Sequence, residues 1–266
     1  MQSLIRCRSP YVVDHIFSWF ENQTYFIQME YCLDNLKTII DKKNEIFNNN
    51  YPIETKPLKT KRLMSSLEYY ISGLLYYQLV ECVQHIHQLK PKPFIHTDLK
   101  PDNILIVGYK KQLANNSFID YRLKLADLGL ATVCNDNNDI CCFKGTPSYM
   151  APEVRCGGQY SQKSDVYSLG IIGEQLFNIC IPEPETIDSY FGHNLYDKIN
   201  HLAKQLRLIT STKPIDRPNC SQIIDDTDGW LITFDEIFNA ENFHNDLNML
   251  KLNDYKLFYE LIKINV

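Results

Sequence analysis

The sequence predicts an α+β fold in which a mainly helical body carries a small β-sheet. Three observations support it: a β-hairpin pattern at residues 11–31, a long helical pattern at residues 63–86, and a polar turn between two apolar runs at residues 94–107. A chain of 266 residues with 44% hydrophobic content can bury a large core. We therefore expect one domain, with up to two lobes.

The N-terminal residues 1–8 are predicted to form the tail of a helix that Ser9-Pro10 ends. Apolar residues then recur up to a polar turn at residues 21–23, and a second apolar run extends from Tyr25 to Tyr31. Two such runs joined by a short polar turn are typical of antiparallel strands. A β-hairpin follows from this pattern.

Helical signals follow the hairpin. Residues 34–40 predict a short helix, whereas residues 41–62 are polar, rich in Asn and Lys, and predict a flexible insertion. Apolar residues at spacings of three and four then predict a long core helix over residues 63–86. We expect His85 and His87, near its end, to be surface or packing residues, because no matching metal-ligand pair follows.

The polar turn within residues 94–107, FIHTDLKPDNILIV, brings together groups that suit phosphoryl transfer. The carboxylate of Asp98 can orient an attacking hydroxyl and accept its proton, and the ammonium of Lys100 can offset charge on a moving phosphoryl group. The amide oxygen of Asn103 can bind magnesium. Pro101 stiffens the turn that holds the three side chains.

Residues 108–121 separate this turn from the next apolar run and predict an elongated surface hairpin. Such a hairpin is either a docking element for a partner or a solvated loop. Asp127 then stands at the end of an apolar strand, just before a glycine turn, where its carboxylate can face the same metal as Asn103.

The remaining part of the chain is predicted to be helical. Ser164 suits an N-cap and precedes an apolar helix face. Residues 230–266 carry apolar residues at helical spacing and few turn formers. We expect one or two further helices there, packed on the helical body.

Three motifs together resemble the eukaryotic protein kinases. HTDLKPDN, at residues 96–103, resembles the H-R-D-L-x-x-x-N catalytic loop, and residues 127–129 resemble D-F-G. GTPSYMAPE, at residues 145–153, resembles the loop that ends in A-P-E. Their order matches that of the family. The resemblance therefore implies a protein-kinase-like fold, with a mainly helical large lobe and a partial small-lobe sheet.

The resemblance implies roles for the candidate site residues. Asp98 would be the catalytic base and Lys100 the charge-stabilising residue, while Asn103 and Asp127 would bind Mg²⁺, with ATP as phosphoryl donor. His96 would be structural.

The ATP site implied by the resemblance uses the hinge between the lobes. Met29 matches the gatekeeper, and Glu30 to Cys32 match the hinge, where backbone groups contact adenine in the family. Leu105, in the apolar run after the catalytic loop, is also expected at the ATP site.

Two structural relationships are also implied. In the family, the aspartate at the position of Asp165 braces the catalytic loop from below. Arg217 would pair with Glu153 in a buried ion pair. The expected organisation is a partial small lobe and hinge at 1–32, a large lobe at 33–226 with insertions near 41–62 and 108–121, and a helical extension at 227–266.

The chain departs from the family pattern at two motif positions. Thr97 replaces the arginine of H-R-D, and Leu128 replaces the phenylalanine of D-F-G. Both replacements occur in active kinases resembling the SR-protein and LAMMER groups. Lys100 and Pro101 favour serine and threonine over tyrosine as the acceptor.

A glycine-rich loop and a strand lysine of V-A-I-K type have no match before Ser9-Pro10. Either the sequence is a fragment, or the protein dispenses with the first half of the small lobe. Two functions are therefore open: a Ser/Thr protein kinase, or a non-catalytic pseudokinase-like mimic that docks on kinases or their substrates.

The composition of the chain indicates which classes of partner and which cellular compartment to expect. The formal net charge of -5 disfavours a nucleic-acid binder that works by bulk attraction. Nine cysteines without CxxC spacing indicate a reduced, intracellular protein, in the cytoplasm or nucleus. No apolar run of about 20 residues is present, so no membrane insertion is expected. The expected partner is a protein substrate, with docking through residues 108–121 or the C-terminal helices.

Overall fold

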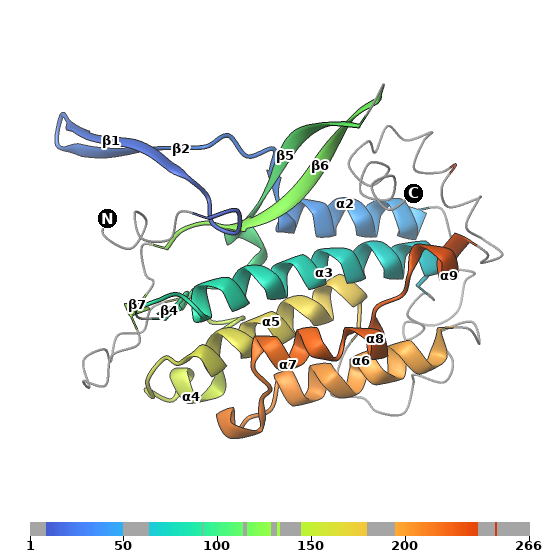
Figure 1. Cartoon of the computed structure of the whole chain (residues 1–266). Helices are drawn as coiled ribbons and strands as arrows, with labels where there is room; N and C mark the ends of the chain where they lie inside the picture. Colours follow the sequence, from blue (N-terminus) through green and yellow to red (C-terminus); the bar gives the residue numbers. More distant parts are fainter. Residues whose placement is uncertain are drawn as a thin grey trace.

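The computed structural model describes residues 9–49, 64–91, 93–113, 116–128, 132–133, 145–179, 195–238 and 248. It confirms a mainly helical fold with small antiparallel sheets (Figure 1). The helices are α2 (Leu36–Asn49), α3 (Ser66–His87), α4 (Pro152–Arg155), α5 (Gln162–Phe177), α6 (Tyr196–Ile209), α7 (Cys220–Asp225), α8 (Thr227–Trp230) and α9 (Phe234–Phe238). The short 3₁₀ turns are η1 (Pro101–Asn103) and η3 (Pro214–Asp216).

The strands form three separate sheets within the described residues. One is the antiparallel pair β1 (His15–Glu21) and β2 (Thr24–Met29), and another pairs β4 (Phe94–Ile95) with β7 (Thr132–Val133). The third has the order β3 (Asp34–Asn35), β5 (Ile104–Leu113) and β6 (Asn116–Leu125).

Helix α3 is the centre of the core, as the apolar spacing predicted. It begins after the N-cap Ser65, whose side chain accepts the N–H of Glu68. Figure 1 shows α3 between the β5–β6 hairpin with α2 on one side and α5 with α7 on the other. The Ser72 hydroxyl donates to the carbonyl of Leu176 on α5 at 2.9 Å. This central helix fixes the strands and helices that carry the site.

Helix α2 corrects one prediction. Residues 41–49 continue the helix instead of beginning a flexible insertion. Ile46 and Phe47 are buried, and the buried ammonium of Lys43 pairs with Glu68 at 2.8 Å. The polar composition concealed an inward-facing stripe, because a lysine with a carboxylate partner can occupy a core position. The rest of the predicted insertion, residues 50–62, lies outside the described residues.

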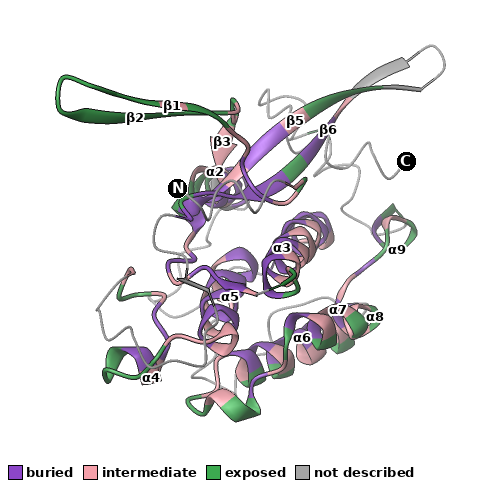
Figure 2. Ribbon diagram, turned by 60° about the vertical axis from the view of Figure 1, so that its left-hand side comes forward, coloured by how far each residue is buried: buried purple, intermediate pink, exposed green. Residues whose placement is uncertain are grey.

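The predicted N-terminal hairpin is confirmed as β1–β2, with a tight turn in which Asn22 and Gln23 both have positive φ values. Figure 2 shows it as a largely exposed arm that projects from the helical body. Its aromatic side chains stack on one another: the ring centroids of Trp19 and Phe26 are 5.1 Å apart. Large apolar side chains are exposed along both strands: Ile16, Phe17, Trp19, Phe20, Tyr25, Phe26, Ile27 and Met29.

The elongated hairpin predicted at residues 108–121 is also confirmed, since β5 and β6 pair in register from Ile104–Leu125 to Leu113–Asn116. The base of this hairpin is tied to the N-terminal region, because Val13 N–H donates to the carbonyl of Leu125 at 2.9 Å. Ala126, the residue after β6, donates its N–H to the carbonyl of Asn103 at 2.9 Å. The two ends of the hairpin therefore meet at the candidate site.

Helices α8 and α9 are the described part of the predicted C-terminal helices, and they bury Trp230 and Ile237. Two other predictions lie outside the described residues: the helix tail at 1–8 and most of the C-terminal helices, at 239–266. Among the described helices, none is both long and apolar enough to span a bilayer.

Candidate active site

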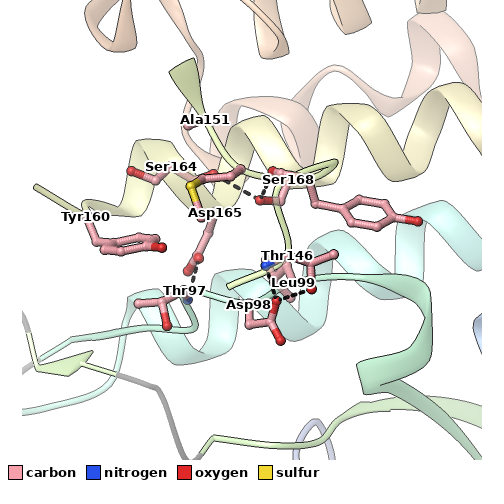
Figure 3. A pocket seen from close by; sticks show the side chains of 11 residues that line it. Thr97, Asp98, Leu99, Thr146, Ala151, Tyr160, Ser164, Asp165 and Ser168 are labelled. Atoms are coloured by element: carbon pink, nitrogen blue, oxygen red, sulfur yellow. Dashed lines mark hydrogen bonds between the residues drawn. The ribbon is translucent and has the colours of Figure 1, made fainter. Parts of the chain in front are cut away.

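The catalytic turn, residues 96–103, connects β4 to β5, and its central carboxylate belongs to Asp98. That side chain is 7% exposed. Its Oδ1 accepts hydrogen bonds from the backbone N–H and the hydroxyl of Thr146, both at 2.8 Å (Figure 3). Its Oδ2 accepts from the Asn103 amide at 3.1 Å. Hydrogen bonds therefore fix the direction of both oxygens.

Lys100 lies beside this carboxylate. Its Nζ is 3.2 Å from Oδ2 of Asp98 and donates to the hydroxyl of Thr146 at 3.0 Å. A quarter of the side chain is exposed, so the ammonium remains accessible from solvent. The structure thus brings a carboxylate, an ammonium and a hydroxyl into mutual contact.

The fit of a magnesium ion depends on Asn103 and Asp127. The side-chain amide nitrogen of Asn103 donates hydrogen bonds to the carboxylate of Asp98 and, at 2.9 Å, to the backbone carbonyl of Asp98. The side-chain oxygen of Asn103 is therefore the atom that can bind the ion. Asp127 is exposed, and it directly follows Ala126, whose N–H binds the carbonyl of Asn103. The described residues contain no group of three or more His, Cys, Asp or Glu that could hold a metal. One or two carboxylates with phosphate oxygens suffice for Mg²⁺, so these residues fit it.

Asp165, on α5, holds the backbone of the catalytic turn from below, as predicted. Its Oδ2 accepts the N–H of His96 at 2.8 Å. Its Oδ1 accepts the N–H of Thr97 at 3.0 Å (Figure 3). Thr97 has a φ of 70°, a left-handed conformation that β-branched residues rarely adopt. The two hydrogen bonds stabilise this unfavourable turn immediately before Asp98.

His96 has the structural role that was expected. Its ring is fully buried, and Nε2 lies 3.0 Å from the carbonyl of Ala126. Burial lowers the pKa of His96, although the nearby carboxylates of Asp165, Asp98 and Asp127 oppose this effect. The ring therefore links the catalytic turn to the strand end that carries Asp127.

The four residues expected at the ATP site lie along the hinge and β5. Met29 ends β2 and is 43% exposed, while Cys32 is half-buried and its thiol lies 3.7 Å from the carbonyl of Glu30. Leu105 lies in β5 opposite Asn35. The adjacent backbone pairs with the same strand, since Leu33 N–H donates to the carbonyl of Ile106 at 2.8 Å.

The Glu30 side chain reaches Lys124 on β6, while the expected adenine contact of this residue is made by its backbone. Its Oε1 accepts the N–H of Asp14 at 2.7 Å and pairs with the ammonium of Lys124 at 2.5 Å. Burial alone would lower the pKa of Lys124, but hydrogen bonds to Glu30 and Tyr109 outweigh it and raise that pKa. This pair ties the hinge to the β5–β6 hairpin, and nothing in the sequence pattern had indicated it.

A pocket with about 240 Å³ of empty space, part of it open to solvent, borders Asp98 (Figure 3). It lies between the catalytic turn, the segment 145–153 and α5. Its lining residues are Thr97, Asp98, Leu99, Thr146, Tyr149, Met150, Ala151, Tyr160, Ser164, Asp165 and Ser168.

Thr146 is the site residue that the sequence reasoning missed. The available signal was its place directly after Gly145 in GTPSYMAPE. Gly145 has a φ of 105°, and a Cβ there would lie 2.7 Å from the carbonyl oxygen of Thr97. Only glycine therefore lets the segment approach the catalytic turn closely enough for Thr146 to reach Asp98.

Comparisons with known proteins show which sequences this chain is similar to. The family model described as the protein kinase domain matches residues 1–233. The chain is 30% identical over 223 residues to the interferon-induced, double-stranded RNA-activated protein kinase of Rattus norvegicus, covering 80% of this chain and 37% of that protein. It is 31% identical over 260 residues to a putative serine/threonine-protein kinase of Acanthamoeba polyphaga mimivirus, covering 90% of this chain and 53% of the viral protein. The chain thus spans well under two thirds of the length of these relatives.

Proposed function

Since this chain belongs to the protein kinase family, we propose that its site transfers the γ-phosphate of ATP to serine and threonine hydroxyls of protein substrates. One observation carries the proposal most directly: Asp98, Lys100 and Thr146 are in mutual contact at the end of a pocket. The viral relative is named a putative serine/threonine-protein kinase, which supports the choice of acceptor.

In this mechanism Asp98 orients the substrate hydroxyl and accepts its proton. Its two oxygens are held by Thr146 and Asn103, so the carboxylate needs little reorganisation when the hydroxyl arrives. Lys100, already beside the carboxylate, offsets negative charge on the phosphoryl group as it moves. Positioning and charge stabilisation of this kind account for nearly all of phosphoryl-transfer catalysis.

The amide oxygen of Asn103 and the carboxylate of Asp127 would hold magnesium. Bound there, magnesium would supply positive charge that offsets the negative charge of the phosphate groups. Asn103 has a second task, because its amide nitrogen orients the Asp98 carboxylate. The same side chain would therefore couple the metal site to the catalytic base.

Magnesium-dependent ATP binding tests this assignment without requiring turnover. We expect Mg²⁺ to raise the affinity of the chain for ATP in calorimetric titrations, and Asp127→Asn to remove that increase. Asp102→Asn is the matched control, because Asp102 lies on the exposed side of η1 and loses the same charge. Equal effects of the two substitutions would contradict the metal assignment.

Docking of protein partners is proposed for the 108–121 hairpin and the C-terminal helices. The hairpin carries exposed Tyr109 and Lys110, and Lys111 pairs with the buried carboxylate of Asp120 at 2.5 Å. We place this activity inside the cell, and the free thiols of Cys32, Cys82, Cys156 and Cys220 support a reducing compartment.

A second candidate function is a kinase-lobe mimic that docks on kinases or their substrates. It is supported by the β1–β2 hairpin, whose two strands expose large apolar side chains. A purified kinase domain of the rat relative provides the test. Inhibition of that kinase by this chain, unchanged by Asp98→Asn but removed by Phe20→Asp, would favour the mimic. Absence of inhibition, together with Asp98-dependent phosphate transfer, would favour the enzyme.

A further inference from the structure

The hinge is attached to the β5–β6 hairpin at points on both faces of that hairpin. On one face, Leu33, the residue after the hinge, packs so closely on β5 that a Cβ at Gly108 would lie 3.1 Å from its Cδ1. On the opposite face, Lys124 of β6 contacts Glu30. Leu105 lies opposite Lys124 in the strand pairing, so the two side chains share this second face. It therefore carries both an expected ATP-site residue and a contact to the hinge.

Lys124 is a buried lysine whose ammonium has two neighbours. The residue is 2% exposed. Its Nζ lies 2.5 Å from Oε1 of Glu30, and it also lies over the ring of Tyr109, at 5.7 Å from the ring centroid. An aromatic ring attracts a cation at this distance, more strongly where water is excluded. Tyr109 is exposed, so its ring shields the ammonium from water.

Glu30 is fixed through its side chain and its backbone together. The oxygen that pairs with Lys124 also accepts the N–H of Asp14 at 2.7 Å. In the other direction, the N–H of Glu30 donates to the carbonyl of Asp14 at 2.9 Å. The backbone that is expected to contact adenine is therefore held by Asp14 directly and by Lys124 through the carboxylate.

The Lys124 ammonium keeps its charge despite burial. Burial lowers the pKa of Lys124, but hydrogen bonds to Glu30 and Tyr109 outweigh burial and raise that pKa. The ammonium is therefore charged at neutral pH. Because a buried charge without its partner is strongly unfavourable, the ammonium keeps the Glu30 carboxylate at the hairpin. Tyr109 supports this contact with both its ring and its hydroxyl.

We propose that Tyr109 and Lys124 are positioning residues for the adenine site: Tyr109 holds the Lys124 ammonium on Glu30, and this ion pair holds the hinge backbone where adenine binds. The inference rests on the proposed function, because the hinge matters through ATP. It gives the elongated hairpin a role in nucleotide affinity. Loss of the contact would let the hinge backbone move and would weaken adenine binding without affecting the groups that bind magnesium.

Another lysine of the same hairpin provides the matched control. Lys111 lies on the same face as Tyr109, and its Nζ pairs with Asp120 at 2.5 Å. Asp120 also pairs with Arg122 at 3.1 Å, so it keeps a partner when Lys111 is replaced. Lys111→Met and Lys124→Met therefore remove the same charge from the same hairpin, but only Lys124→Met removes the contact with Glu30.

Amide hydrogen exchange of the chain without nucleotide tests the contact itself. We expect Lys124→Met to speed exchange at the amides of Asp14 and Glu30 by about tenfold. Tyr109→Leu should speed it by about threefold, and Tyr109→Phe, which keeps the ring, by less. Lys111→Met should change neither amide. Added to Lys124→Met, Tyr109→Leu should have no further effect, because the ring acts through the ammonium.

Ligand binding tests whether the contact serves the adenine site. Adenosine requires the hinge, whereas magnesium tripolyphosphate requires the metal ligands and has no base. Saturation-transfer NMR follows the first ligand and phosphorus NMR the second. We expect Lys124→Met to weaken adenosine binding by about tenfold, as the lost charged contact predicts, and to leave tripolyphosphate binding unchanged. Lys111→Met should leave both unchanged.

Three results would overturn the proposal: equal exchange in Lys124→Met and Lys111→Met, additive effects of Tyr109→Leu and Lys124→Met, or adenosine affinity that Lys124→Met leaves unchanged. Retained tripolyphosphate binding shows that a variant is folded. A native chain that binds no adenosine at millimolar concentration would instead contradict the proposed function. The exchange rates at Asp14 and Glu30 would still decide whether Tyr109 and Lys124 hold the hinge.

Discussion

The guanidinium of Arg217 binds both carboxylate oxygens of Glu153, with Nη1 to Oε1 and Nη2 to Oε2 each at 2.7 Å. The arginine is fully buried, and its Nε and Nη1 also donate to the carbonyls of Ser211 and Lys163, both at 2.8 Å. This bidentate pair joins the end of segment 145–153 to the loop before α7. It confirms the ion pair that the sequence predicted.

Removal of Arg217 should be strongly destabilising, because it leaves the Glu153 carboxylate partly buried without its partner. We expect Arg217→Ala to lower the free energy of unfolding by about 3–5 kcal/mol. Lys110→Ala, in the exposed part of β5, should change it by less than about 0.5 kcal/mol. Denaturant unfolding of both variants gives the comparison, and equal midpoints would contradict a structural role for the pair.

The same pair predicts a pH dependence. Burial would raise the pKa of Glu153, but hydrogen bonds from Arg217 and others outweigh it and lower that pKa below its ordinary value of 4.5. A lowered folded-state pKa means that the contribution to stability is present above pH 4.5 and is lost as pH falls through the lower, folded-state pKa. The stability gap between the native chain and Glu153→Gln should therefore be constant near neutral pH and narrow in acid. A gap that widens in acid would contradict this.

The sequence predicted the framework of the fold because local signals and tertiary packing agree there. The long core helix, both hairpins and the brace from Asp165 all follow from periodicity or from the kinase motifs. Helix α2 was misjudged at Lys43 because a polar residue becomes a core residue only through a distant partner, Glu68. The Glu30–Lys124 pair was missed for the same reason. Side-chain contacts between distant segments have no local signature.

The catalytic centre was predicted in part. Asp98, Lys100 and Asn103 lie within one turn, so their proximity follows from the sequence. Thr146 comes from a segment 48 residues away and depends on the backbone freedom of Gly145. The expected roles of these residues remain predictions that activity measurements have to test.

The hydroxyl of Thr146 should contribute to catalysis through its contacts with Asp98 and Lys100. We expect Thr146→Val, which keeps the shape but loses the hydroxyl, to lower kcat by about tenfold, the effect of one or two lost hydrogen bonds. Thr146→Ser should retain most of the activity. Steady-state kinetics on a version extended upstream, with an active site complete enough for turnover, decide the matter. A valine variant as active as the serine variant would show that the hydroxyl has no catalytic role.

The threonine at position 97 bears on whether activity depends on phosphorylation. A threonine side chain cannot form the bidentate contact with a phosphate that an arginine makes at this motif position. In a complete protein, we therefore expect activity that does not require phosphorylation of the activation segment, which lies between the motifs resembling D-F-G and A-P-E. Phosphatase treatment followed by an activity assay provides the check. A large loss of activity that rephosphorylation restores would refute the prediction.

The central claim is that Asp98 is the base of a phosphoryl-transfer site, and phosphate transfer from radiolabelled ATP to casein tests it most directly. Residues 1–266 contain no match to a glycine-rich loop or strand lysine, so we expect little or no transfer from them alone. A version extended upstream, or one supplemented with a small-lobe fragment that carries both motifs, should label serine and threonine. Asp98→Asn should then reduce labelling by about 10²- to 10⁴-fold, and Asp127→Ala should abolish it, while Asp102→Asn leaves it unchanged. Robust labelling that survives Asp98→Asn would contradict the assigned site.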